Sequence, residues 1–229
     1  PALVFVYLAY MFFEPIFTSA NTEDVGDPLT GVVQTVSSDI SMSCDSETSL
    51  SPSIAPSATG YAPASGSSIG DLICTIKTNS SAGFSATIKN KDWSESDVAL
   101  RHSTDATQKF TNYPTTATYN WAEPSSGVAY LGFTIGATPS TEDATDIDLA
   151  FKNDGVNCGT GVNTNDSGNM GSAYCWRGLN DTTNITFVNS SDETDSNGEA
   201  FKIRLRARAN AKTLKAGIYG TDLTITATL

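Results

Sequence analysis

Hydrophobic and polar positions alternate most regularly in the last 29 residues of the chain. In residues 201–209 every second residue is apolar, and the residues between them are Lys202, Arg204, Arg206 and Arg208. Side chains along a strand point alternately to opposite faces, so this pattern predicts a strand with one buried and one cationic face. After a turn at residues 215–217 the alternation resumes over residues 223–229, which predicts a second half-buried strand.

Shorter strand-like segments occur through the rest of the chain, and none has the sustained 3.6-residue apolar period of an amphipathic helix. Residues 45–70 contain three prolines and many Ser and Gly residues, which predicts a long connection. Many short strands joined by polar loops predict an all-β fold, an antiparallel β-sandwich of the immunoglobulin-like or jelly-roll kind. The predicted strands are 32–36, 40–44, 72–76, 84–88, 117–121, 128–135, 147–151 and 185–188.

Residues 2–13 form an uninterrupted apolar run that ends at Glu14. The run is shorter than the roughly 20 residues that span a bilayer, so no stable membrane span is expected. Two interpretations remain open. The run is either the remnant of a secretion signal, with small residues at 18–20, or a retained segment that must be buried between subunits because exposing it would be too costly. On the second interpretation the subunit-interface side chains are Leu3, Val4, Phe5, Val6, Tyr7, Leu8, Tyr10, Met11, Phe12 and Phe13.

The chain therefore divides into three parts. Residues 1–20 are a hydrophobic N-terminal segment, residues 21–31 a polar, turn-prone linker, and residues 32–229 a single β-sandwich domain with long loops.

The charge is strongly acidic and unevenly spread. Twenty-five Asp and Glu residues against thirteen Lys and Arg residues give a net charge of −12, which argues against a nucleic-acid partner. Six of the thirteen basic residues lie between Lys202 and Lys215. The cationic stripe of Lys202, Arg204, Arg206 and Arg208 has two interpretations: a solvated outer face that discourages edge aggregation, or a surface that attracts a second, acidic copy of the chain.

Four cysteines, Cys44, Cys74, Cys158 and Cys175, form an even set without CxxC spacing. Two disulfides are expected rather than a zinc site, and disulfides indicate an oxidising, extracellular environment. Three connectivities are formally possible. Sequence-local closure favours Cys44 with Cys74 and Cys158 with Cys175.

The sequence gives no positive support for catalysis, and we expect that the protein is not an enzyme. The only histidine, His102, lies in a polar run and is interpreted as a loop residue, so no base is expected beside a nucleophile. A glycosidase needs only two carboxylates, so the sequence does not exclude one.

Neither a metal nor another cofactor is predicted. Glu193, Asp195 and Asn197 follow the oxygen-ligand spacing of a calcium loop, but Arg204 occupies the position of the bidentate glutamate, so they are weak candidates. The three tryptophans, Trp93, Trp121 and Trp176, are interpreted as core or sheet-edge residues rather than as a sugar-stacking platform.

Three segments carry a resemblance to a known family: Cys44 through 72–76 (LICTI), 82–88 (AGFSATI), and the ending 216–226 (AGIYGTDLTIT). They resemble secreted bacterial pilin-like sandwich subunits of the spore coat U and archaic chaperone-usher pilin type. The resemblance covers about a third of the chain. It implies a cysteine bridge between an early strand and the next, and an incomplete immunoglobulin-like sandwich that is completed by the N-terminal strand of a neighbouring subunit.

The leading hypothesis is a structural subunit of an extracellular filament, pilus- or fimbria-like, that forms a homopolymer by inserting its N-terminal segment into a neighbour. The alternative is a cell-surface adhesin or glycan-binding module, with host or surface glycans as partners.

Overall fold

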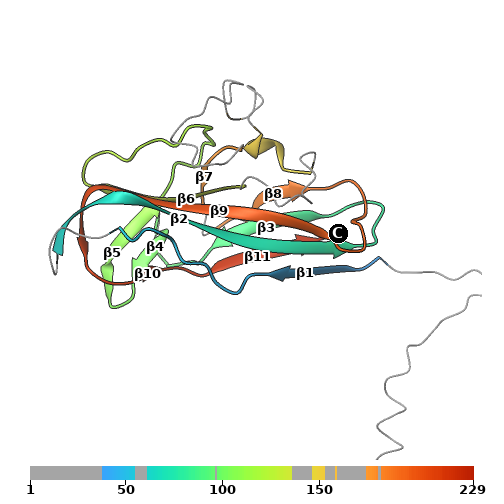
Figure 1. The fold of residues 1–229 in the computed structure, drawn as a ribbon, viewed down its shortest axis with the longest axis horizontal. Coiled ribbons are helices and arrows are strands. Elements are labelled where there is room, and N and C mark those ends of the chain that lie inside the picture. The colour runs from blue at the N-terminus through green and yellow to red at the C-terminus, as the bar shows by residue number, and fades with distance from the viewer. Residues whose placement is uncertain are drawn as a thin grey trace, which may run out of the picture. The chain divides into compact units, whose positions relative to one another are not determined.

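The computed structural model describes residues 38–54, 61–95, 97–135, 146–152, 158, 174–179 and 182–229. The described part of the chain is an all-β fold in which two sheets pack face to face as a β-sandwich, which confirms the predicted fold class (Figure 1). The predicted strand 32–36 and the hydrophobic N-terminal segment lie outside the described residues.

The larger sheet has eight strands and is antiparallel except where β5 and β6 pair in parallel. β9 lies between β2 and β6, and β7 pairs with β6 beside the main path. Along that path the order is β1 (Ile40–Cys44), β2 (Tyr61–Thr78), β9 (Glu199–Lys215), β6 (Val128–Ile135), β5 (Asp105–Asn112), β4 (Leu100–His102) and β10 (Tyr219–Gly220); β7 is Arg177–Gly178.

The smaller sheet has three antiparallel strands in the order β11 (Leu223–Thr228), β3 (Ser85–Asn90) and β8 (Ile185–Asn189). The alternation in β11 matches its position on the sandwich. Its apolar residues are half-buried and pack against the core, and its threonines are exposed.

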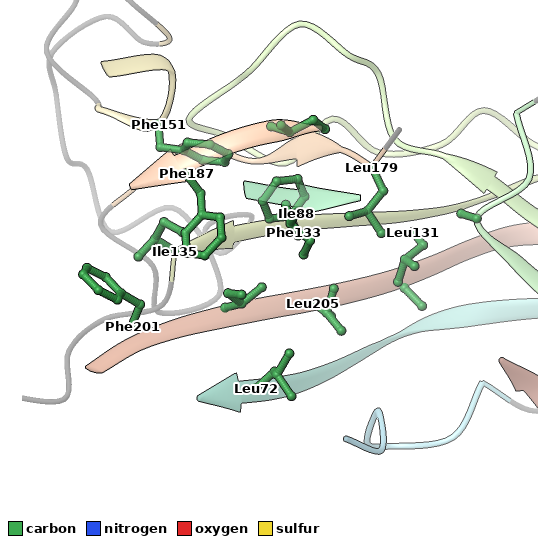
Figure 2. Close-up of a cluster of buried hydrophobic side chains, with 14 of the residues drawn as sticks. Leu72, Ile88, Leu131, Phe133, Ile135, Phe151, Leu179, Phe187, Phe201 and Leu205 are labelled. Atoms are coloured by element: carbon green, nitrogen blue, oxygen red, sulfur yellow. The ribbon is translucent and has the colours of Figure 1, made fainter. Parts of the chain in front are cut away.

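Aromatic side chains from both sheets fill the space between the layers at one end of the sandwich (Figure 2). Phe133 of β6 and Phe201 of β9 come from the larger sheet, and Phe187 of β8 comes from the smaller one. Phe151, in a short 3-10 helix at Leu149–Phe151, packs on Phe133 with 5.2 Å between the ring centroids. All four rings are fully buried, so this end of the core is closed by the chain's own side chains.

Most predicted strands are present, and β6 has the predicted bounds. Three expectations were wrong. β2 begins at Tyr61, inside the predicted long connection; the segment 147–151 is a bridge residue and a 3-10 helix; and 117–121 contributes only an isolated bridge from Thr118 to Trp176. The small residues in the first half of β2 suit a strand that is held by main-chain pairing with β9, since β1 pairs only with residues 74–78.

Candidate functional site: a groove between the two sheets

A groove of about 1000 Å³ opens between the two sheets on the side where β1 and β11 form their edges. β1 ends the strand order of the larger sheet and β11 ends that of the smaller one. The two strands approach each other, with Cα atoms within 8 Å, although they are not paired (Figure 1). The C-terminal part of β1 (Met42 and Cys44) and the N-terminal part of β11 (Leu223 and Ile225) line the groove.

The floor of the groove is apolar and belongs to the larger sheet. Its residues come from five adjacent strands and are almost fully buried: Leu72, Leu100, Phe110, Leu131, Leu205 and Ala207. A floor of this kind favours an apolar occupant, because each large side chain that it covers is stabilised by about 1.5 to 3 kcal/mol.

Both walls of the groove present main-chain groups that no described strand pairs. The N–H of Asp45 bonds to the carbonyl of Ile73, and antiparallel pairing alternates, so the main-chain groups of Met42 and Cys44 point away from β2. In the same way the N–H of Lys91 bonds to the carbonyl of Asp222, so the main-chain groups of Leu223 and Ile225 point away from β3. Two open strand edges therefore face each other across an apolar floor.

The β1 wall is held in place by a disulfide and by the segment that follows it. Cys44 is bonded to Cys74 on the neighbouring strand β2. Beyond β1 the chain runs along the same edge of β2, where Ser51 and Ile69 exchange main-chain hydrogen bonds of 2.8 and 2.9 Å. Gly70 lies under this segment. A Cβ atom there would come within 2.7 Å of the Leu50 side chain, so only glycine lets the two pack.

The opposite rim is the turn that precedes β11, and His102 anchors it. Gly217, Ile218 and Tyr219 line the groove. The His102 ring packs edge-to-face on Tyr219, with ring centroids 5.0 Å apart, and its Nε2 atom lies 3.2 Å from the carbonyl oxygen of Ala216. A Cβ atom on Gly217 would come within 2.2 Å of Nε2, so this position also requires glycine.

His102 is therefore not the solvated loop residue that the sequence predicts. It is the last residue of β4 and is buried. Its polar neighbours hide this, because a three-residue strand that leads into a tight turn reads as a loop in the sequence.

The charged residues that line the groove are all acidic: Asp45, Glu47 and Asp222, with no Lys or Arg among its described lining residues. Asp222 pairs with Lys91, with 2.6 Å between Oδ2 and Nζ. Such a lining disfavours an acidic occupant.

The cationic stripe lies on the outer face of the larger sheet, away from the groove floor, and it is locally neutralised. Arg204 makes a bidentate pair with Asp71, with both N–O distances 2.7 Å, and this guanidinium lowers the pKa of the Asp71 carboxyl. Arg208 donates to Glu123 at 2.6 Å, and Lys202 also lowers the pKa of Asp71. Edge protection is the wrong interpretation, because β9 is flanked by β2 and β6 and is not an edge strand.

On that outer face Arg206 packs against a second group of buried side chains. It is buried, bonds to the Ser67 hydroxyl at 3.0 Å and places its guanidinium 4.6 Å from the Trp121 ring centroid. Trp121 and Trp176 are themselves buried and pack edge-to-face. Trp93, half-buried, is covered by Lys91 and Arg101. Buried rings cannot stack on a sugar, so the two buried tryptophans are core residues, as expected.

The two disulfides are Cys44–Cys74 and Cys158–Cys175, which confirms the sequence-local pairing. They place the protein in an oxidising environment outside the cytoplasm.

The calcium candidates do not assemble into a cage. The Asp195 carboxylate accepts hydrogen bonds from the main-chain N–H groups of Asn197 and Gly198, so it stabilises its own turn. Glu193, like Asp195 and Asn197, is exposed. Within the described ranges no group of three or more His, Cys, Asp or Glu side chains is placed to hold a metal ion.

The predicted interface residues Leu3–Phe13 lie outside the described residues. Among those that are described, no helix is both long and apolar enough to cross a membrane. Comparison with known proteins found no matching family model, no matching curated protein and no matching solved structure.

Proposed function

We propose that the protein is a structural subunit of an extracellular filament, and that the apolar N-terminal segment of one copy inserts into the groove of the next. The observation that carries this proposal is the groove itself, with two unpaired strand edges above an apolar floor. A strand placed between β1 and β11 would pair with both edges and join the two sheets into one continuous sheet once these strands part to about 10 Å, twice the spacing of paired strands, from their closest approach within 8 Å.

The chemistry of the N-terminal segment fits such a place. Residues 2–13 are apolar and uncharged, so they suit a floor of Leu and Phe side chains whose charged rim residues are acidic. β1 and β11 are five and six residues long, and a strand of that length spans about 20 Å. The apolar run is about twice as long, which leaves enough chain to cover the groove.

Insertion into a second copy gives a fibre because the contact joins two different surfaces. Head-to-tail contacts that do not close into a ring propagate without limit. The oxidising environment indicated by the two disulfides is compatible with assembly outside the cell.

Deletion of residues 1–20 tests the proposal. The truncated protein should fold and stay monomeric, whereas the full chain forms fibres that are visible in negative-stain micrographs. Fibres that persist without residues 1–20 would refute it. A full chain that stays monomeric at every concentration would also refute it, since the segment would then fill the groove of its own chain or none.

A matched pair of substitutions tests the main-chain pairing. Met42→Pro removes an N–H group that points into the groove, whereas Met42→Ala shortens the side chain but keeps the N–H group. Edge strands tolerate proline, so both variants should fold. Only Met42→Pro should abolish fibres, and equal assembly of the two variants would contradict pairing along β1.

The adhesin hypothesis remains the alternative function. No specific observation favours it, because Trp121 and Trp176 are buried and Trp93 is covered by two cationic side chains. A glycan-array signal that Trp93→Ala abolishes would support it.

A further inference from the structure

We infer that the exposed side chain of Ile218 is a binding anchor at the groove rim, and that with it the groove selects an occupant that is apolar on both faces. The inference deepens the proposed function: it rests on the insertion of residues 2–13 and names the chemistry by which the groove recognises them. It is carried by the exposure of Ile218, its place in the groove and the ordered turn that holds it.

The exposure of Ile218 matters because of where the residue lies. Its exposed fraction is 76%, the largest for any large apolar side chain among the described residues. A single exposed apolar residue on a protein surface needs no explanation. Ile218, however, lines the groove together with the half-buried Leu223 and Ile225 of β11. An occupant of the groove would therefore cover it.

The turn around Ile218 is ordered before anything binds. The Ile218 carbonyl accepts a hydrogen bond of 2.9 Å from the N–H of Ser103. The next residue, Tyr219, pairs with His102 in the ladder between β10 and β4. Its ring packs edge-to-face on those of His102 and Phe110, with centroid distances of 5.0 and 5.3 Å. Because ordering a loop opposes binding, an apolar side chain on a turn that is already ordered makes an efficient anchor.

An inserted strand has two faces, and the floor of the groove covers only one of them. Side chains alternate along a strand, so every second side chain of the occupant would lie on Leu72, Leu131 and Leu205 of the floor. The other side chains would face the opening of the groove. Ile218, on the turn that forms one rim, is the exposed apolar residue that can cover them.

The apolar segment has the composition that such a groove selects. A strand with cover on one face only alternates apolar and polar residues, as β11 does. Residues 2–13 do not alternate, so both faces of a strand formed by them would be apolar. One face would carry Val4, Val6, Leu8, Tyr10 and Phe12, and the other Leu3, Phe5, Tyr7, Ala9, Met11 and Phe13. A contact on the second face keeps those side chains out of water.

Binding of three carrier-fused peptides to the intact chain tests the inference. One peptide has the sequence of residues 2–13, and the other two carry serine at all even or all odd positions of that sequence. Ile218→Ser removes the anchor from the chain. Leu149→Ser is the matched control, because Leu149 is 59% exposed and does not line the groove. Dissociation constants are measured below the concentration at which the chain assembles.

The unaltered peptide should bind wild type and Leu149→Ser equally, and Ile218→Ser about tenfold or more weakly, as expected for the loss of one large apolar contact. Both serine peptides should bind the wild type more weakly than the unaltered peptide does. The peptide whose serines face the rim should bind Ile218→Ser as well as the unaltered peptide does, because the contact it lacks is already gone. The other serine peptide should still bind more weakly.

An affinity that Ile218→Ser leaves unchanged overturns the inference, and so does a penalty for both serine peptides that survives in this variant. Two measurements distinguish the side chain from the turn. Ile218→Val keeps an apolar side chain and should bind nearly as well as wild type. Hydrogen exchange at the Ser103 amide should be the same in wild type and Ile218→Ser; faster exchange in the variant would assign the loss to the turn and overturn the anchor.

Fibre formation distinguishes this inference from the proposed function. The concentration at which the full chain assembles should rise about tenfold in Ile218→Ser and stay unchanged in Leu149→Ser. Wild-type fibres with an unchanged threshold in Ile218→Ser overturn the anchor and leave the proposed function standing. Peptide binding that depends on Ile218 in a chain that never forms fibres does the opposite. A chain that neither forms fibres nor binds the unaltered peptide overturns both.

Discussion

The two ends of the space between the sheets differ in how they are filled. At the closed end Phe133 and Phe201 of the larger sheet meet Phe187 of the smaller one, and Phe151 covers Phe133 (Figure 2). At the groove the larger sheet supplies Leu72, Leu131 and Leu205, and the smaller sheet contributes the half-buried Leu223 and Ile225 of its edge strand β11. The space between the sheets is thus filled by large aromatic side chains at one end and opens into a groove at the other. This difference is what makes the open end a candidate binding surface.

The largest effect is expected at the closed end. Phe133→Ala should lower the free energy of unfolding by about 3 to 5 kcal/mol, because it leaves a cavity among fully buried rings. Urea denaturation measures this loss. A loss below about 1 kcal/mol would mean that the closed end relaxes around the cavity, and the contrast between the ends would not hold.

Removing each disulfide in turn distinguishes a loss of stability from damage to the groove. Replacing Cys44 and Cys74 by alanine opens a 30-residue loop and should cost about 3 to 4 kcal/mol; for Cys158 and Cys175, 17 residues apart, about 3 kcal/mol is expected. Thermal unfolding of both double variants measures these losses.

Only the first double variant should also lose fibre formation at a temperature where it is still folded, because Cys44 lines the groove. Equal assembly of the two folded variants would show that the β1 wall does not need its covalent tie.

Leucine truncations compare the groove floor with a buried leucine that does not line the groove. Replacing Leu179 by alanine should cost about 3 to 4 kcal/mol, whereas replacing Leu72 at the groove floor should cost about 2 kcal/mol. The smaller loss is expected because the groove is already open above Leu72. Chemical denaturation of both variants checks the order, and a reversed order would contradict an open groove.

The smallest effect is expected outside both regions, at the Asp71–Arg204 pair. Arg204 holds the pKa of Asp71 below its ordinary 3.8, so the stabilisation by the pair is present above that pH and is lost as the pH falls below it. Asp71→Asn should remove this part of the acid dependence and cost less than about 1 kcal/mol at neutral pH. Unfolding free energies at pH 7 and pH 3 measure both. An unchanged acid dependence would show that the pair contributes nothing.

The fold class follows from the sequence because alternation is a local property of each strand. β6 could be located from its apolar run and β11 from its alternation of apolar and polar residues. The first half of β2 could not, since Ser65, Gly66 and Ser67 carry little side-chain information and the strand is held by its neighbours. β4 and β5 could not be located either, because β4 has only three residues and β5 is mostly polar, so their pairing leaves no apolar alternation in the sequence.

The groove could not be predicted from the sequence. It exists because β1 and β11, which are far apart in the chain, become the edges of two sheets that lie one on the other. No local sequence pattern shows that β1 and β11 lie close together in the fold. The nearest clue in the sequence is that both strands have an apolar, half-buried residue at every second position: Ile40, Met42 and Cys44 in β1, and Leu223, Ile225 and Ala227 in β11.

The separation of the two groove walls along the chain also matters for biosynthesis. Translation delivers β1 early and β11 long afterwards, so a nascent chain carries the first wall without the second. The groove is therefore complete only after β11 has docked on β3, so the site exists only in the folded protein and not in a partly made chain.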